Sequence, residues 1–94
     1  MFSQQARWDR KMPGDHGEKW EHAEVTARFA KGKIVPLRFI LGQGARCAIE
    51  KINFSWSERH GNAVLYFFSV TDKTESYRLC LDTETMSWLA TPLQ

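Results

Sequence analysis

The chain lacks long hydrophobic runs, a secretory signal and a large net charge. No apolar segment approaches the roughly 18 residues that a membrane-spanning helix needs, so a helical membrane protein is excluded. The opening residues, Met1 to Gln4, do not lead into the apolar stretch of a secretory signal. The net charge of +2 is too small to require a nucleic acid or an acidic membrane as the partner.

Cysteine is scarce, and the common enzyme motifs are missing. Cys47 and Cys80 lie far apart and form no C-x-x-C motif, which argues against a disulfide framework and predicts reduced thiols in the cytoplasm. There is no G-x-S-x-G pattern, and the glycines of 42–44 precede no helix that could hold a phosphate. His16 and His22 have the chemistry of zinc ligands, but their spacing matches no known zinc finger. We therefore expect no enzymatic activity, no cofactor and no metal site.

What the chain does contain is enough apolar material for one domain. Hydrophobic residues make up 43% of its 94 residues, and aromatic residues 13%. Residues 1–21 differ from the rest, because they are polar and show neither a helical nor a strand period. We predict a mobile N-terminal extension over 1–21, whose Trp8 and Trp20 could dock on the body, and a β-domain over 22–94.

From residue 22 onward, short runs of alternating apolar and polar residues are separated by turn residues, as is typical of β-strands. No segment has the length and period of an amphipathic helix. Pro36 cannot donate a backbone hydrogen bond, which predicts a sheet edge or a bulge at its position. The sequence predicts an all-β fold, a single six-stranded antiparallel meander curled into a small barrel or half-barrel. The expected strands are 24–29, 34–41, 45–56, 63–70, 75–81 and 86–90.

The longest expected strand, 45–56, changes phase in its middle. Its inward-facing residues have odd numbers up to Ile49 and even numbers from Ile52 onward, so a bulge or bend is expected near Glu50. The run 63–70 is apolar on both sides, which predicts a central strand. The predicted core consists of Val25, Phe29, Leu37, Phe39, Ile49, Ile52, Phe54, Val64, Tyr66, Phe68, Leu79, Leu81 and Trp88.

Basic residues concentrate in the middle of the chain. Residues 28–59 hold seven Lys and Arg against two Glu, a net charge of +5, whereas 60–94 hold two basic and four acidic residues, a net charge of −2. Small antiparallel barrels bind single-stranded nucleic acid with outward arginines and exposed aromatic rings. The candidate residues for binding nucleic acid or a protein partner are Arg28, Arg38, Arg46, Lys51, Arg59, Arg78 and Trp56.

The function that we expect is that of a non-enzymatic binding or interaction module, because the sequence offers sheet edges but no catalytic motif. The expected edges are 34–41 and 86–90. The second edge carries no charge, so it could pair with a protein partner or with a second copy in a weak homodimer. The alternative is binding of single-stranded nucleic acid through an arginine-bearing sheet face. No membrane partner is expected.

Several short patterns have a counterpart in known sequences. They are A-x-F at 27–29, G-x-I-x-P-x-x-F at 32–39, I-x-x-I at 49–52 and a closing leucine followed by Trp88. With these patterns, about 70 residues of the chain resemble small uncharacterised all-β domains of bacteria, common in Gram-positive genomes. The resemblance implies a curled antiparallel sheet of unknown function and assigns no catalytic residue. The polar N-terminal extension departs from it.

Overall fold

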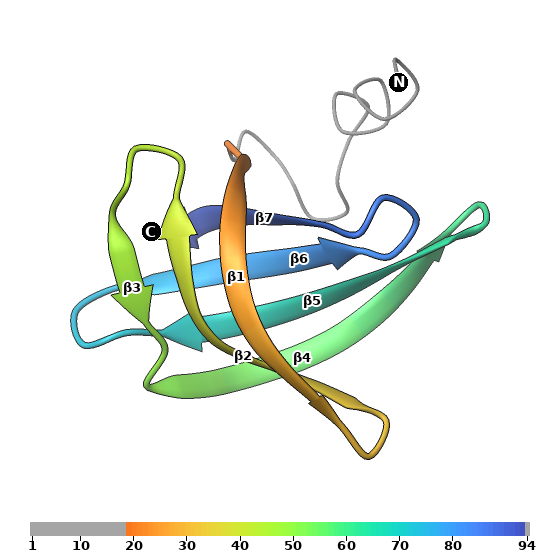
Figure 1. Cartoon of the computed structure of the whole chain (residues 1–94), viewed down its shortest axis with the longest axis horizontal. Helices are drawn as coiled ribbons and strands as arrows, with labels where there is room; N and C mark the ends of the chain where they lie inside the picture. The colour runs from red at the N-terminus through yellow and green to blue at the C-terminus, as the bar shows by residue number, and fades with distance from the viewer. Residues whose placement is uncertain (1–18, 94) are drawn as a thin grey trace.

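The computed structural model describes residues 19–93, which form a single antiparallel sheet (Figure 1). Its order across the sheet is β3-β2-β1-β7-β6-β5-β4. The predicted all-β class is confirmed. The described residues form no helix, so none there is long and apolar enough to cross a membrane. The strands are β1 (Glu21–Ala30), β2 (Lys33–Leu41), β3 (Arg46–Ala48), β4 (Lys51–His60), β5 (Ala63–Thr71), β6 (Ser76–Asp82) and β7 (Ser87–Leu93).

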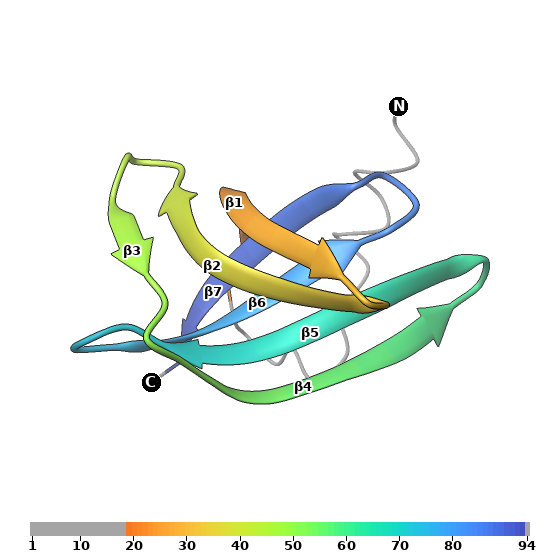
Figure 2. The same ribbon diagram turned by 60° about the horizontal axis from the view of Figure 1, so that its bottom comes forward.

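The sheet curls into a half-barrel that is closed at one end (Figure 2). Strands that follow each other in sequence are neighbours in the sheet, except β3 and β4, which form its two edges. Between these strands the chain passes from one edge to the other. The Ile49 N–H donates to the carbonyl of Leu37 on β2 at 3.0 Å, and the Glu50 N–H donates to the carbonyl of Thr71 on β5 at 2.9 Å. Two consecutive residues therefore join the opposite sides of the curl.

Seven strands replace the expected six, because the chain turns from one edge to the other within 45–56 and so forms both β3 and β4. The predicted phase change is confirmed at this crossing. A second irregularity was not predicted. The register between β4 and β5 shifts between Ile52 and Phe54, which turns the side chain of Phe54 outward. Phe54 is 69% exposed, so its predicted place in the core is wrong.

Two further residues of the predicted core, Phe29 and Leu37, are 60% and 38% exposed. Leu37 lies at a bulge, because the partner on β2 changes from Arg38 to Pro36 between two consecutive residues of β1. This bulge confirms the prediction made from Pro36. Phe29 pairs with Ile34 next to the hairpin tip, where the curl is open.

β7 lies in the middle of the sheet, between β1 and β6. The expectation that this strand forms an edge is wrong, because the beginning of β1 pairs with it, with Glu21 opposite Ala90 and Ala23 opposite Trp88. The edges are β3 and β4, so the other expected edge, 34–41, is also wrong for the sheet as a whole: it is β2, which has β3 beside its second half and no strand beside the outer side of its first half. A strand added to this sheet, whether from a partner or from a second copy, would therefore pair at one of these edges.

Apolar side chains fill the inside of the curl, and a second, smaller cluster lies on its outer face. The inner cluster joins buried residues from five of the seven strands, and partly buried residues of β1 and β4 pack against it. The buried residues are Phe39, Leu41, Cys47, Phe68, Val70, Tyr77, Leu79 and Ala90. On the outer face, Trp20 packs against Leu65, Phe67 and Cys80. The two cysteines are both free and buried, on opposite faces of the sheet.

The predicted boundary between extension and domain needs a small correction. β1 begins at Glu21, and the preceding Trp20 already belongs to the packed body, since its ring meets Phe67 edge to face at a centroid distance of 6.4 Å. Trp8 and the rest of 1–18 lie outside the described residues.

Candidate binding site between β2 and β4

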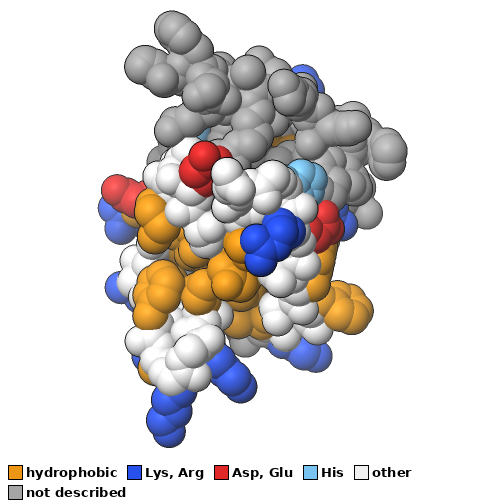
Figure 3. All heavy atoms as spheres, turned by 90° about the vertical axis from the view of Figure 1, so that its right-hand side faces the viewer, with side chains coloured by type: hydrophobic (Ala, Val, Ile, Leu, Met, Phe, Trp, Pro, Cys, Tyr) orange, Lys and Arg blue, Asp and Glu red, His pale blue; other side chains and the backbone are white. Residues whose placement is uncertain are grey.

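The open side of the curl forms a slit between the first half of β2 and the middle of β4. We call it the β2–β4 slit. It has a volume of about 450 Å³, within the range of roughly 300–1,000 Å³ that is usual for binding sites. In Figure 3, hydrophobic side chains gather on the face that shows the open end, with Lys and Arg side chains around them. The slit is lined by Gly32, Lys33, Ile34, Val35, Ile52, Ser55, Trp56, Ser57, Tyr66 and Phe68.

One wall of the slit is the free edge of β4. His60 and Ala63 flank the two-residue turn of the β4–β5 hairpin, so they form a pair that exchanges both backbone hydrogen bonds. Along the hairpin, such pairs alternate with pairs that exchange no backbone hydrogen bond. Ser55, Ser57 and Arg59 belong to the second kind, so their N–H and C=O groups point away from β5. Among the described residues, β4 pairs with β5 alone, so these groups have no strand partner.

The opposite wall is the first half of β2. Lys31 and Gly32 both have positive φ, 53° and 76°, which makes the tight turn between β1 and β2. Ile34 is the second residue after this turn and pairs with Phe29, so its N–H and C=O groups point away from β1. Two strands of the half-barrel therefore present backbone donors and acceptors to the same slit.

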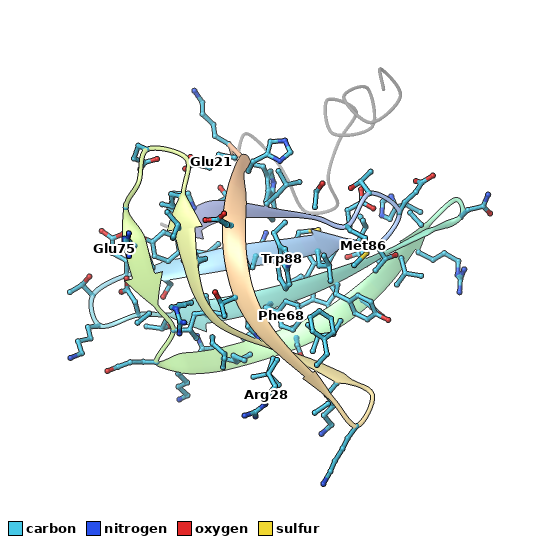
Figure 4. The ribbon with its side chains drawn as sticks, viewed as in Figure 1. Glu21, Arg28, Phe68, Glu75, Met86 and Trp88 are labelled. Carbon is cyan, nitrogen blue, oxygen red and sulfur yellow. The ribbon has the colours of Figure 1, made fainter. Side chains whose placement is uncertain are left out.

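The side chains of the slit are apolar at its floor. Phe68 belongs to the inner cluster, and Ile52 and Tyr66 pack against it. The ring of Trp88 continues this floor, with its centre 5.9 Å from that of the Phe68 ring (Figure 4). Ser55 and Ser57 line the β4 side. Lys33 is the one charged side chain among the lining residues, and no carboxylate is among them.

The outer face of β4 carries two exposed aromatic residues, Phe54 and Trp56. The indole N–H of Trp56 donates to Glu58 at 3.1 Å, and Glu58 also contacts His60 at 3.4 Å. The guanidinium carbon of Arg78 lies 5.8 Å from the centre of the Trp56 ring, which is cation–π geometry. A strand added to β4 would therefore meet aromatic rings on its outer side and the slit on its inner side.

The structure separates the seven predicted binding residues into different places. Arg38 and Arg46 line a hollow of about 260 Å³ on the outer face of β2 and β3 together with Glu24, and Arg28 points away from the interior on the same side of β1 (Figure 4). The remaining four predicted residues, Lys51, Arg59, Arg78 and Trp56, lie on β4 and β6.

Most of the slit has no signal in the amino-acid sequence. Ser55, Ser57 and Lys33 belong to no motif, whereas Ile52, Tyr66 and Phe68 were expected only as core residues. Among the seven predicted binding residues, Trp56 lines the slit, and Pro36 correctly indicated a bulge on β2, the strand of the opposite wall.

The titratable cluster inside the closed end offers no nucleophile. The Tyr77 hydroxyl donates to the Glu75 carboxylate at 2.7 Å, and this bond, together with burial, raises the pKa of the phenol. Burial also raises the pKa of the Cys47 thiol, against the opposite effect of its hydrogen bond with Tyr77. Both groups therefore hold their protons at neutral pH, and the thiolate that nucleophilic chemistry needs is suppressed.

Among residues 19–93, no group of three or more His, Cys, Asp and Glu side chains is placed to hold a metal ion. His22 is exposed on β1, and its suggested zinc partner His16 lies outside the described part of the chain. Comparison of the chain with models of protein families, with curated proteins and with solved structures gave no match. The resemblance to bacterial β-domains stays a prediction, and the β2–β4 slit is the feature that points to a function.

Proposed function

We propose that this protein is a non-enzymatic binding module that takes an extended peptide segment as an added strand along β4, in the β2–β4 slit. The observation that carries the proposal is the free edge of β4 beside an apolar hollow. An extended peptide satisfies the exposed backbone groups of Ser55, Ser57 and Arg59, and its alternate side chains enter the slit.

The backbone groups in the slit favour a peptide over a purely apolar ligand. A hydrocarbon chain would fill the floor at Ile52 and Phe68 but would leave N–H and C=O groups on both walls without partners, at a cost of about 1–3 kcal/mol for each group that it buries. The two free cysteines fit a reducing compartment, and we place the protein in the cytoplasm on that ground.

Single-stranded nucleic acid remains the alternative. Arg28, Arg38 and Arg46 lie on one outer face, which suits phosphate contacts. The large exposed hydrophobic side chains on the sheet include Trp56 and Phe54, but both lie on β4, away from these arginines. Arg78 lies over Trp56, but the face that carries Arg28, Arg38 and Arg46 is separate from the aromatic rings of β4, and we favour the peptide.

The test compares two substitutions at one residue. Proline at Ser57 removes the N–H that faces the slit but no hydrogen bond to β5, whereas alanine keeps this N–H. A displayed library of random peptides of about eight residues supplies the ligands. We expect the unmodified protein and Ser57→Ala to select peptides and Ser57→Pro to lose them. Equal selection by all three proteins, or none by the unmodified protein, would overturn the proposal.

Two further measurements keep the test independent of how well the proline variant folds. Bound peptide should slow amide hydrogen exchange at Ser55 and Ser57 of the unmodified protein, and unchanged exchange would contradict strand addition. Binding of a single-stranded oligonucleotide at low salt, without any selected peptide, would replace the proposal by its alternative. In the same way, sedimentation of the protein alone as a dimer that Ser57→Pro splits would identify the added strand as β4 of a second copy.

A further inference from the structure

We infer that the β2–β4 slit selects an acidic peptide segment, with its carboxylates toward Lys33 and Arg59 and its apolar side chains toward the closed end. This inference rests on the proposed function and names the chemistry of the ligand. It is carried by the uneven distribution of charge along the two walls of the slit.

Exposed cations lie on both strands that form the walls of the slit, near the turn that joins each strand to its hairpin partner. Lys33 lines the slit from β2, one residue after the tight turn, and Lys31 is exposed in that turn. On β4, Arg59 pairs with Val64 and is exposed, and strand alternation places its side chain on the same face as Ser55 and Ser57. A ligand bound along β4 beyond Ser57 therefore reaches Arg59, and Lys33 adds positive charge from the β2 wall.

The two carboxylates next to or within β4 lie outside the slit. Glu58 lies on the outer face of β4, where its two oxygens contact Trp56 and His60. Glu50 lies at the opposite, closed end of the slit, next to Lys51. No Asp or Glu is among the lining residues, so an acidic ligand meets no like charge within the slit.

Toward the closed end the slit becomes apolar. Phe68 is a buried member of the inner cluster, and the partly buried Ile52 packs against it. Phe54 is exposed on the outer face of the same part of β4. An added strand would thus have apolar surface on both of its faces at one end and cations at the other. The matching ligand is an extended segment of alternating apolar residues with carboxylates at one end.

The charged contacts at the open end are exposed, so they act mainly on selectivity and depend on salt. Two oppositely charged versions of one peptide should consequently differ in affinity at low salt and converge at high salt. A bound segment held only by backbone pairing and apolar contact would not distinguish the two.

The experiment uses two synthetic peptides of about eight residues with the same alternating Val and Ser pattern, one ending in two Glu and the other in two Lys. We expect the acidic peptide to bind about tenfold more tightly at low salt, with a smaller difference in high salt. The double variant Lys33→Glu, Arg59→Glu should reverse this preference. Lys73→Glu, in the exposed turn between β5 and β6, is the matched control and should leave it unchanged.

The outcomes separate this inference from the proposed function. Equal binding of both peptides, or tighter binding of the basic peptide, would overturn the acidic preference and leave strand addition standing. Failure of both peptides to bind would contradict the two proposals together. If the double variant keeps the preference for the acidic peptide, other residues recognise the charge of the peptide, and the proposed role of Lys33 and Arg59 is overturned.

Discussion

The indole of Trp56 lies flat on the ring of Phe67, with their centroids 5.1 Å apart and their planes 7° from parallel. The two residues are direct cross-strand partners on β4 and β5. Phe67 is fully buried, whereas Trp56 remains 37% exposed. The stack therefore ties the free edge strand to the outer apolar cluster while part of the indole stays exposed.

This stack should appear as a coupling energy in a double-mutant cycle. Trp56→Leu, Phe67→Leu and the double variant remove the ring contact but keep apolar side chains. We expect a coupling of about 0.5–1.5 kcal/mol in the free energy of unfolding by urea. Phe54→Leu, on the same face and largely exposed, is the control and should change stability by less than about 0.5 kcal/mol. Strict additivity of the two ring substitutions would contradict the prediction.

A charge placed in the middle of the sheet should unfold the domain. Leu89 is 3% exposed on β7, which pairs with β1 and β6. We expect Leu89→Lys to cost more than about 3 kcal/mol, because the ammonium group is buried without a partner. Met86→Lys, at an exposed turn position nearby, should be nearly neutral. Equal melting temperatures for the two variants would show that β7 is not central.

Stability at alkaline pH should depend on Tyr77. Its pKa is raised in the folded protein by the hydrogen bond to Glu75 and by burial, relative to about 10 in an unfolded chain. The folded state thus holds this proton more tightly. Its contribution to stability is complete below about pH 10 and is lost as the pH rises toward the folded-state pKa. The free energy of unfolding, measured with urea, should fall more steeply above about pH 10 for the unmodified protein than for Tyr77→Phe. Parallel dependence on pH in the two proteins would contradict the prediction.

One turn residue is placed where glycine fits better. Met86 has φ of 58° and is exposed, so glycine removes backbone strain without loss of packing. We expect Met86→Gly to raise the free energy of unfolding by about 0.5 kcal/mol. Lys73→Gly, in an exposed turn without positive φ, should instead lower it, because glycine only adds freedom to the unfolded chain. A lower free energy of unfolding in Met86→Gly would contradict this explanation.

Local patterns were sufficient to predict much of the strand content. Alternation identified Tyr77, Leu79 and Leu81 as inward residues, and they are buried on β6. The run that is apolar on both sides became β5, which has a partner strand on each side. These features depend on neighbours in sequence, which is why the sequence alone could reveal them.

The order of the sheet and the slit depend on contacts between distant residues. Nothing in the local sequence around Glu21 or Ala90 shows that these residues face each other, and an uncharged last strand looked like an edge. The slit combines Lys33 from β2 with Ser55 and Ser57 from β4, which meet only because the sheet curls. The sequence around a polar residue such as Ser55 does not indicate that the residue lies at a strand edge beside a hollow.

The pairing of β1 with β7 sets the sequence of events during synthesis. The strands β1 to β3 and β4 to β6 can each form from local hairpins as they leave the ribosome, but the strand that unites them is made last. Until it arrives, β1 and β6 both have an open edge in what becomes the centre of the sheet. A nascent chain that pauses before Ser87 therefore holds two incomplete sheets instead of a nearly finished one, and this is the stage at which it is most exposed to aggregation or most in need of a chaperone.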